Sequence, residues 1–243
     1  MARFKITIQY DGTKFFGWQF QPEKRTVQDE LEKVISTFSD GEKIKVFGAG
    51  RTDTGVHALS QVAHFDLNTD LDTCNLIKAL NAHLSEDILV ESLDVVPANF
   101  HARYSAQKRY YRYQCYTGNN VLFRNQSWIT GQLDQSILQS VAETVVGEHD
   151  FLSFCKFRID IKSTVCKIYE SVWKKQDKML IYYVSGNRFL HHMVRYLTGT
   201  MVEISRGRFT IESFLNLLNN PEKNVQIFKA PPQGLILEKV DYA

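Results

Sequence analysis

The order in which strand-like and helix-like segments alternate constrains the fold of this chain most. Residues 3–10 alternate apolar and polar side chains, which is the period of a half-buried β-strand. In the first half, strands are predicted at 3–10, 44–48, 61–67 and 88–96, and helices at 27–38 and 73–84. The order of these segments along the chain is βαββαβ, as in a ferredoxin-like fold, where helices connect strands of one sheet.

The second half repeats this order with longer segments. We therefore predict an α+β protein of two ferredoxin-like halves, 1–100 and 101–243, whose sheets meet around a central cleft. The second half predicts strands near 104–116 and 235–240, a hairpin turning at Asp177-Lys178, and helices near 134–146, 189–205 and 211–219.

Composition restricts the class of protein. With 243 residues, 44% hydrophobic and 23% charged, the chain can bury a large core. No apolar run approaches the roughly 18 residues of a membrane span, and the N-terminal ARFKITIQY lacks the apolar stretch of a signal peptide. The four cysteines stand far apart without a CxxC pair, so neither a zinc site nor a disulfide framework is indicated. We expect a soluble cytoplasmic protein.

A glycine-rich segment interrupts the strand pattern at 46–58, VFGAGRTDTGVHA. One reading is a turn in which the glycines supply positive φ and Asp53 caps the chain. Another is a reactive loop, in which the glycines let a substrate backbone approach Arg51 and Asp53 closely. The spacing matches neither GxGxxG nor a Walker loop, so nucleotide hydrolysis is not indicated. Composition leaves the first two readings open.

Residues 101–125 mix cations with aromatic rings. This stretch holds five Lys and Arg residues and no Asp or Glu, with six Tyr and Phe residues among them. Such a mixture is typical of surfaces that bind nucleic acid.

Four motifs together resemble the tRNA pseudouridine synthase family. They stand in the family's order, and the resemblance runs from about residue 3 to the terminal strand. Ser85, where a Pro is usual, and Thr54, where Ala is frequent, depart from the pattern without touching its chemical groups. The motifs are YDGTKFFGWQ at 10–19, GRTDTGVHA at 50–58, FHARYSAQKRYYRY at 100–113 and FLHHMVR at 189–195.

The resemblance implies the pseudouridine synthase fold and a homodimer that isomerises uridines 38, 39 and 40 in the tRNA anticodon stem-loop. The base leaves C1′ through nitrogen and rejoins it through carbon, which is redox-neutral and implies no cofactor and no metal. By the same resemblance, Asp53 is the catalytic carboxylate. A carboxylate can attack C1′, stabilise oxocarbenium-like charge or remove a ribose proton, and the sequence leaves these roles open.

Substrate-binding roles are implied for Arg51, Tyr111 and Arg195. Arg195 would keep Asp53 ionised, Tyr111 would stack on the extruded uracil, and Arg51 would hold the RNA backbone. The alternatives are an exposed helix cation for Arg195 and a core tyrosine for Tyr111. Phosphate contacts are expected among Lys108, Arg109, Arg112, Lys156, Arg158 and Arg188.

Two other functions compete with this interpretation. A metallohydrolase could use His57, His64, His101, His191 and His192, but no HExxH pattern supports it. His191 and His192, if adjacent on the predicted helix, could not both face one ion. The second competitor is a non-catalytic RNA-binding module of ferredoxin-like type, in which Asp53 would be dispensable.

Overall fold

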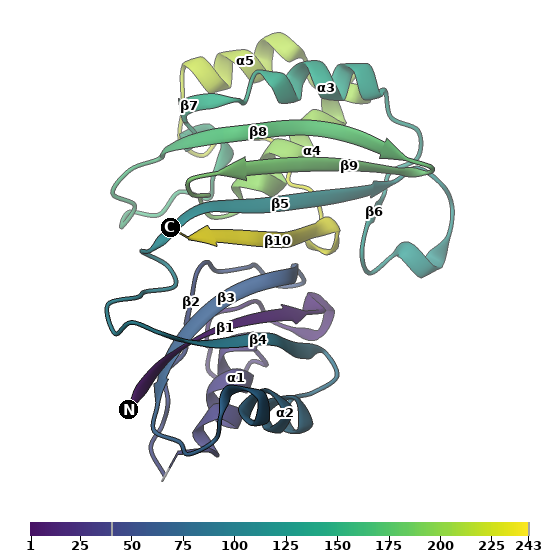
Figure 1. Ribbon diagram of the computed structural model, residues 1–243. Helices are drawn as coiled ribbons and strands as arrows, with labels where there is room; N and C mark the ends of the chain where they lie inside the picture. The colour runs from purple at the N-terminus through teal and green to yellow at the C-terminus, as the bar shows by residue number, and fades with distance from the viewer. Residues whose placement is uncertain (40, 243) are drawn as a thin grey trace. The chain divides into compact units, whose positions relative to one another are not determined.

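The computed structural model describes residues 1–39 and 41–242 and confirms the α+β class (Figure 1). The chain forms two compact units: unit 1 is Met1–Gln107 with Leu237–Ala243, and unit 2 is Lys108–Ile236. Asp53 therefore belongs to unit 1, whereas Tyr111 and Arg195 belong to unit 2. That each unit is ferredoxin-like stays a prediction. Throughout the described residues, every helix is too short or too polar to cross a membrane.

Unit 1 is a sheet with two helices on one of its faces (Figure 1). Its strand order is β4-β1-β3-β10, and β2 pairs with β3. β1 runs antiparallel to both neighbours, and its inward side chains Phe4, Ile6, Ile8 and Tyr10 are at most 4% exposed, which confirms the predicted alternation. The elements are β1 (Ala2–Tyr10), a 3-10 turn η1 (Gly12–Lys14), α1 (Val27–Ser36), β2 (Phe47–Gly48), β3 (His57–Leu67), α2 (Thr73–His83), β4 (Ile88–Val96) and β10 (Leu235–Tyr242).

The strand predicted at 44–48 is shorter in the structure, where β2 comprises Phe47–Gly48 alone. Side chains of α1 take the backbone amides that a neighbouring strand would otherwise bind. The Val46 amide donates to Glu32 Oε1 (3.1 Å), and the Ile44 amide donates to Ser36 Oγ (2.9 Å). Buried and exposed side chains do alternate at 43–47, as predicted. Most of this segment, however, does not form the backbone hydrogen bonds of a strand.

Unit 2 holds strands in the order β5-β9-β8-β7, with β6 parallel to the end of β5. The predicted hairpin turn is confirmed, since Asp177 joins β8 to β9 in a left-handed conformation with φ 52°. The elements are β5 (Ala106–Tyr116), η2 (Val121–Phe123), β6 (Trp128–Ile129), α3 (Gln135–Glu143), β7 (Gly147–Asp150), η3 (Leu152–Phe154), β8 (Val165–Gln176), β9 (Met179–Gly186), α4 (Met193–Ser205), α5 (Ile211–Asn219) and η4 (Pro232–Gly234).

Helix α4 begins four residues later than predicted. His192 adopts a left-handed conformation with φ 64°, so residues before Met193 form a turn rather than helix. From Met193 onward α4 is almost wholly buried, with Leu197 and Met201 fully so. This burial explains why the apolar pattern predicted the body of the helix correctly and not its start.

Candidate active site

The loop that carries Asp53 connects β2 to β3 at residues 49–56. Its side chains divide between the interior and the surface: Thr52 and Val56 are buried, Asp53 is half-buried and Arg51 is exposed. Thr52 Oγ1 lies 2.8 Å from the hydroxyl of Tyr10, whose pKa is raised to about 12 by burial. Thr52 thus anchors the loop through a neutral hydrogen bond directly beside Asp53.

Residues 10–19 hold this loop by its backbone on both sides of Asp53. The Trp18 amide donates to the Thr52 carbonyl (3.1 Å), and the Gly55 amide donates to the Phe15 carbonyl (3.2 Å). Within the loop, the Val56 amide donates to the Asp53 carbonyl (3.1 Å), which closes a turn. Two motifs far apart in sequence therefore form one local structure.

Glycines at two positions allow this close approach. Gly17 has φ +88°, and a Cβ built on it would lie 2.7 Å from the Thr52 carbonyl oxygen and 3.1 Å from the Asp53 carbonyl carbon. A Cβ on Gly12 would lie 2.0 Å from the Val56 carbonyl oxygen. The expectation that the loop glycines supply positive φ is confirmed at Gly55, which has φ 77°, and is wrong at Gly48 and Gly50.

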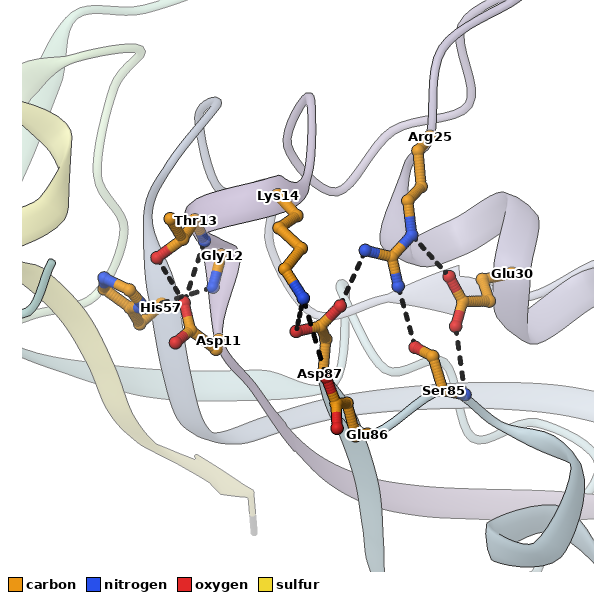
Figure 2. Close-up of polar contacts among 10 residues, drawn as sticks. All are labelled: Asp11, Gly12, Thr13, Lys14, Arg25, Glu30, His57, Ser85, Glu86 and Asp87. Atoms are coloured by element: carbon orange, nitrogen blue, oxygen red, sulfur yellow. Dashed lines mark hydrogen bonds and ion pairs between the residues drawn. The ribbon is translucent and has the colours of Figure 1, made fainter.

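His57, the first residue of β3, packs beside the start of η1 (Figure 2). The Gly12 amide donates to His57 Nδ1 (3.0 Å), so Nδ1 is an acceptor and the ring proton lies on Nε2. Asp11 accepts from the Thr13 amide (2.9 Å) and lies 3.2 Å from His57 Nδ1. Burial alone would raise the pKa of Asp11, but the hydrogen bonds from Thr13 and the charge of Lys14 lower it.

Arg25 forms a polar cluster that sequence reasoning missed (Figure 2). Its guanidinium contacts Asp87 (2.6 Å), Glu30 (3.1 Å) and the Ser85 hydroxyl (2.8 Å). The same guanidinium lies 4.2 Å from the centroid of the Phe15 ring. Because the Phe15 carbonyl accepts from the Gly55 amide, Phe15 links this cluster to the Asp53 loop.

Ser85 takes part in this cluster through both its side chain and its backbone. Its hydroxyl accepts from Arg25, and its amide donates to Glu30 Oε1 (3.2 Å). A proline at this position would remove both groups. The sequence feature that could have indicated this cluster is the serine at position 85, two residues before Asp87, together with Arg25, to which the motifs assign no role.

Tyr111 lies on β5 of unit 2, paired with Val184 of β9. Its side chain is 9% exposed and meets the ring of Phe189 edge-on, with centroids 5.2 Å apart. Tyr113 and Cys115 lie on the same face of β5 and are fully buried. Tyr113 is a core residue whose hydroxyl donates to the Pro231 carbonyl (2.8 Å).

Arg195 is the third residue of α4 and is 7% exposed. The alternative of an exposed helix cation is therefore wrong. Its Nε donates to the Ala230 carbonyl (2.9 Å), and its own carbonyl accepts from the Ala230 amide (2.9 Å). Gly199 permits the close approach of this segment, because a Cβ there would lie 2.3 Å from the Phe228 carbonyl oxygen.

The histidines bear on the metal hypothesis in two ways. Helix α4 begins after His192, and the imidazole centroids of His191 and His192 lie 4.0 Å apart. The argument that a helix keeps these two rings apart is therefore wrong. His57 and His64, in contrast, each accept a backbone amide at Nδ1, from Gly12 and Ala102.

Some predicted phosphate contacts have protein partners. Arg158 pairs with Asp160 (3.1 Å), and Arg109 donates to the Asn187 carbonyl (2.7 Å). Lys108 lies over two aromatic rings, 4.5 Å from that of Tyr110. That any of these side chains binds phosphate stays a prediction.

Comparison with known proteins adds a family to this geometry. A sequence model of the tRNA pseudouridine synthase family matches residues 6–105 and 141–243. The chain is 42% identical to tRNA pseudouridine synthase A of Dictyoglomus turgidum, covering 100% of both chains. It is 40% identical to tRNA pseudouridine synthase A of a Geobacillus species, covering 99% of this chain and 98% of that protein.

Among solved structures, a crystal structure of a Cbf5-Nop10-Gar1 complex matches with a TM-score of 0.40 and 12% identity. The match covers 96% of this chain and 57% of that chain, and at this score it supports no argument. The family match and the two curated relatives, taken with the paired 10–19 and 50–58 motifs, are sufficient: this chain belongs to the tRNA pseudouridine synthase family.

Proposed function

We propose that this protein is an isomerase that converts uridine to pseudouridine in tRNA, at positions 38, 39 and 40 of the anticodon stem-loop. The observation that carries the proposal is that the backbone of the Asp53 loop is held in place by hydrogen bonds to residues 15–18, one before Asp53 and one after it. The family match and the curated relatives, both named for tRNA pseudouridine synthesis, support the reaction class. The exact positions rest on the resemblance of the motifs.

Asp53 is the residue proposed to act at the ribose. The reaction breaks the bond from C1′ to N1, turns the uracil and forms a bond from C1′ to C5. The C5 hydrogen leaves as a proton and N1 takes up a proton, so that the product is an isomer of the substrate. A carboxylate can bond to C1′, stabilise the developing positive charge or take a ribose proton. Because the backbone around Asp53 is already fixed, little of it has to reorganise when the substrate binds.

Arg195 is proposed to keep Asp53 ionised during the reaction. An arginine beside a carboxylate lowers its pKa by about 1–3 units, which offsets the effect of excluding water. The bond from Nε to the Ala230 carbonyl fixes the plane of the guanidinium. A planar guanidinium suits a carboxylate better than a lysine ammonium does.

Tyr111 and Arg51 are proposed to bind the RNA. Removing the target base from its stack costs a few kcal/mol, which contacts in the site must offset. The ring of Tyr111, held by Phe189, can stack on the extruded uracil. Arg51 is exposed two residues before Asp53 and can contact a phosphate next to the target nucleotide.

A tritium-release assay tests this function. Purified protein is incubated with an unmodified tRNA transcript that carries C5-tritiated uridine, without added cofactor. We expect release that disappears when uridines 38, 39 and 40 are replaced by cytidine and persists when other uridines are replaced. No release from any transcript would contradict the reaction, and release from other positions would contradict the proposed target.

Two further expectations are tested with the same material. Release should survive exhaustive chelation, and its loss would favour the metal hypothesis instead. Sedimentation should show a homodimer, the assembly we propose for a cytoplasmic enzyme of this family. The alternative of a non-catalytic RNA-binding module is contradicted by any release that depends on Asp53.

A further inference from the structure

Unit 1 carries a row of four neighbouring rings that the proposed chemistry does not use, formed by Phe47, His64, His101 and Tyr104. Phe47 and His64 are stacked (21° between planes), and the next two pairs are tilted by 60° and 38°. We call this row the aromatic stack. Successive ring centroids lie 5.1, 4.6 and 4.3 Å apart in that order. The two ends are exposed, Phe47 by 47% and Tyr104 by 79%, whereas His64 in between is buried. This aromatic stack therefore presents ring surface to solvent at both ends of a supported row.

The turn that carries His101 and Tyr104 is held in place from several sides. The Ala102 amide donates to His64 Nδ1 (3.2 Å), and the Ala102 carbonyl accepts from the hydroxyl of Tyr242 (2.7 Å). Arg3, paired with Asp66 (2.7 Å), donates to the Phe100 carbonyl (2.9 Å). The exposed rings are thus pre-organised, which limits the conformational entropy that a ligand must overcome.

The two imidazoles within the stack are neutral at neutral pH. Burial lowers the pKa of His64 to about 4, with the nearby His101 and Arg3 acting in the same direction. Burial and the charge of Arg3 also lower the pKa of His101. The row therefore carries aromatic rather than cationic character at neutral pH.

Cationic side chains lie close in sequence to both end rings. Along residues 43–51 the exposed side chains are Lys43, Lys45, Phe47 and Arg51, with no acidic residue among them. On the other side, the Arg103 guanidinium lies 6.0 Å from the Tyr104 ring. Flat aromatic faces flanked by Lys and Arg are the combination that binds unpaired nucleobases together with their phosphates.

The stack is also continuous with the candidate catalytic loop. Phe47 opens β2, and the chain reaches Asp53 six residues later. Six residues span at most about 20 Å. A strand of RNA with its target nucleotide at Asp53 would therefore need only a few nucleotides to reach Phe47.

We propose that this aromatic stack binds an unpaired nucleobase of the RNA substrate, close to the nucleotide that is modified. The inference rests on the proposed function and adds a contact outside the reacting centre. Phe47 and Tyr104 are the two ends on which a base can stack, and the neighbouring cations hold the phosphates on either side.

Binding measurements on Tyr104 variants test the proposal, with affinity for the anticodon stem-loop measured by filter binding at fixed salt. We expect Tyr104→Ala to weaken binding by about 5- to 150-fold, equivalent to about 1–3 kcal/mol for one base–aromatic contact. Tyr104→Phe keeps the ring and should bind within about twofold of the wild type. The control is Leu89→Ala, which removes a 45%-exposed apolar side chain from β4.

The outcomes are distinguishable. Unchanged affinity of Tyr104→Ala overturns the proposal, as does equal weakening by Leu89→Ala. A change in sedimentation of Tyr104→Ala with unchanged RNA affinity also overturns it, because the stack would then be a protein interface. If Tyr104→Ala binds RNA more weakly than the wild type, but the wild type itself releases no tritium, the proposed role of the aromatic stack is supported and the proposed reaction is contradicted.

Discussion

Replacing Gly17 with alanine should disable the Asp53 loop while leaving the protein folded. Gly17 has φ +88° and packs directly on the backbone of Thr52 and Asp53. Gly41 offers a matched control, because it has φ +86° and its Cβ would meet no atom of the described residues within 4 Å. Both substitutions impose left-handed backbone strain, but only one of them presses on the loop.

The magnitudes follow from these geometries. The left-handed conformation costs an alanine about 1–2 kcal/mol, so both variants should lose at least that much free energy of unfolding. At Gly17 the new Cβ would lie 2.7 Å from the Thr52 carbonyl oxygen, whereas ordinary contact begins at 3.4 Å. The loop must therefore move by about 0.7 Å, and because a 1 Å misplacement can cost 10²-fold, we expect about a 10- to 100-fold loss of rate.

The assay is single-turnover tritium release at saturating protein, with urea unfolding and tRNA affinity measured in parallel. Gly17→Ala should release tritium about 10- to 100-fold more slowly than Gly41→Ala, at comparable tRNA affinity. Equal release rates in the two variants would refute the argument that the 10–19 segment positions Asp53.

Three further predictions concern the surroundings of the site. Ser85→Ala removes the hydroxyl that accepts from Arg25 and should lower the free energy of unfolding in urea by about 0.5–1.5 kcal/mol, whereas no loss would show that the cluster contributes nothing. The pKa of His64 is about 4 in the folded protein and 6.5 in a free histidine, so the unfolded chain binds its proton first as the pH falls. Its contribution is complete above pH 6.5 and is lost toward pH 4, so urea titrations at several pH values should show a shallower decline in His64→Gln. Arg195→Lys keeps the charge but not the planar donor fixed by the Ala230 carbonyl, so release should slow at least about tenfold with little change in RNA affinity, and an unchanged rate would argue against a role for the fork.

Local periodicity predicted much of the fold. The segments that became β1, α2, β4 and α5 were predicted to within a residue or two, because one face of each is buried in a regular pattern. The strand at 44–48 was predicted too long, since Glu32 and Ser36 of α1 bind its amides. Periodicity records which side chains are buried and not which group binds each amide.

The residues of the candidate site that belong to a sequence motif could be predicted. Contacts between residues far apart in the sequence could not. The motifs pointed to Asp53 and Arg195, and the structure adds that Arg195 is buried. In the Arg25 cluster, Arg25 contacts Ser85 and Asp87, which lie about sixty positions later in the sequence, and no local pattern connects these side chains. Ser85 was set aside because its role depends on that distant partner.

The central claim is that the Asp53 carboxylate performs the chemistry, and Asp53→Asn tests it most directly. The amide is nearly the same size but lacks the charge, so we expect tRNA affinity and urea stability close to those of the wild type and no detectable tritium release in a single turnover. Release at a rate comparable to the wild type, from a folded variant that binds tRNA, would contradict the account.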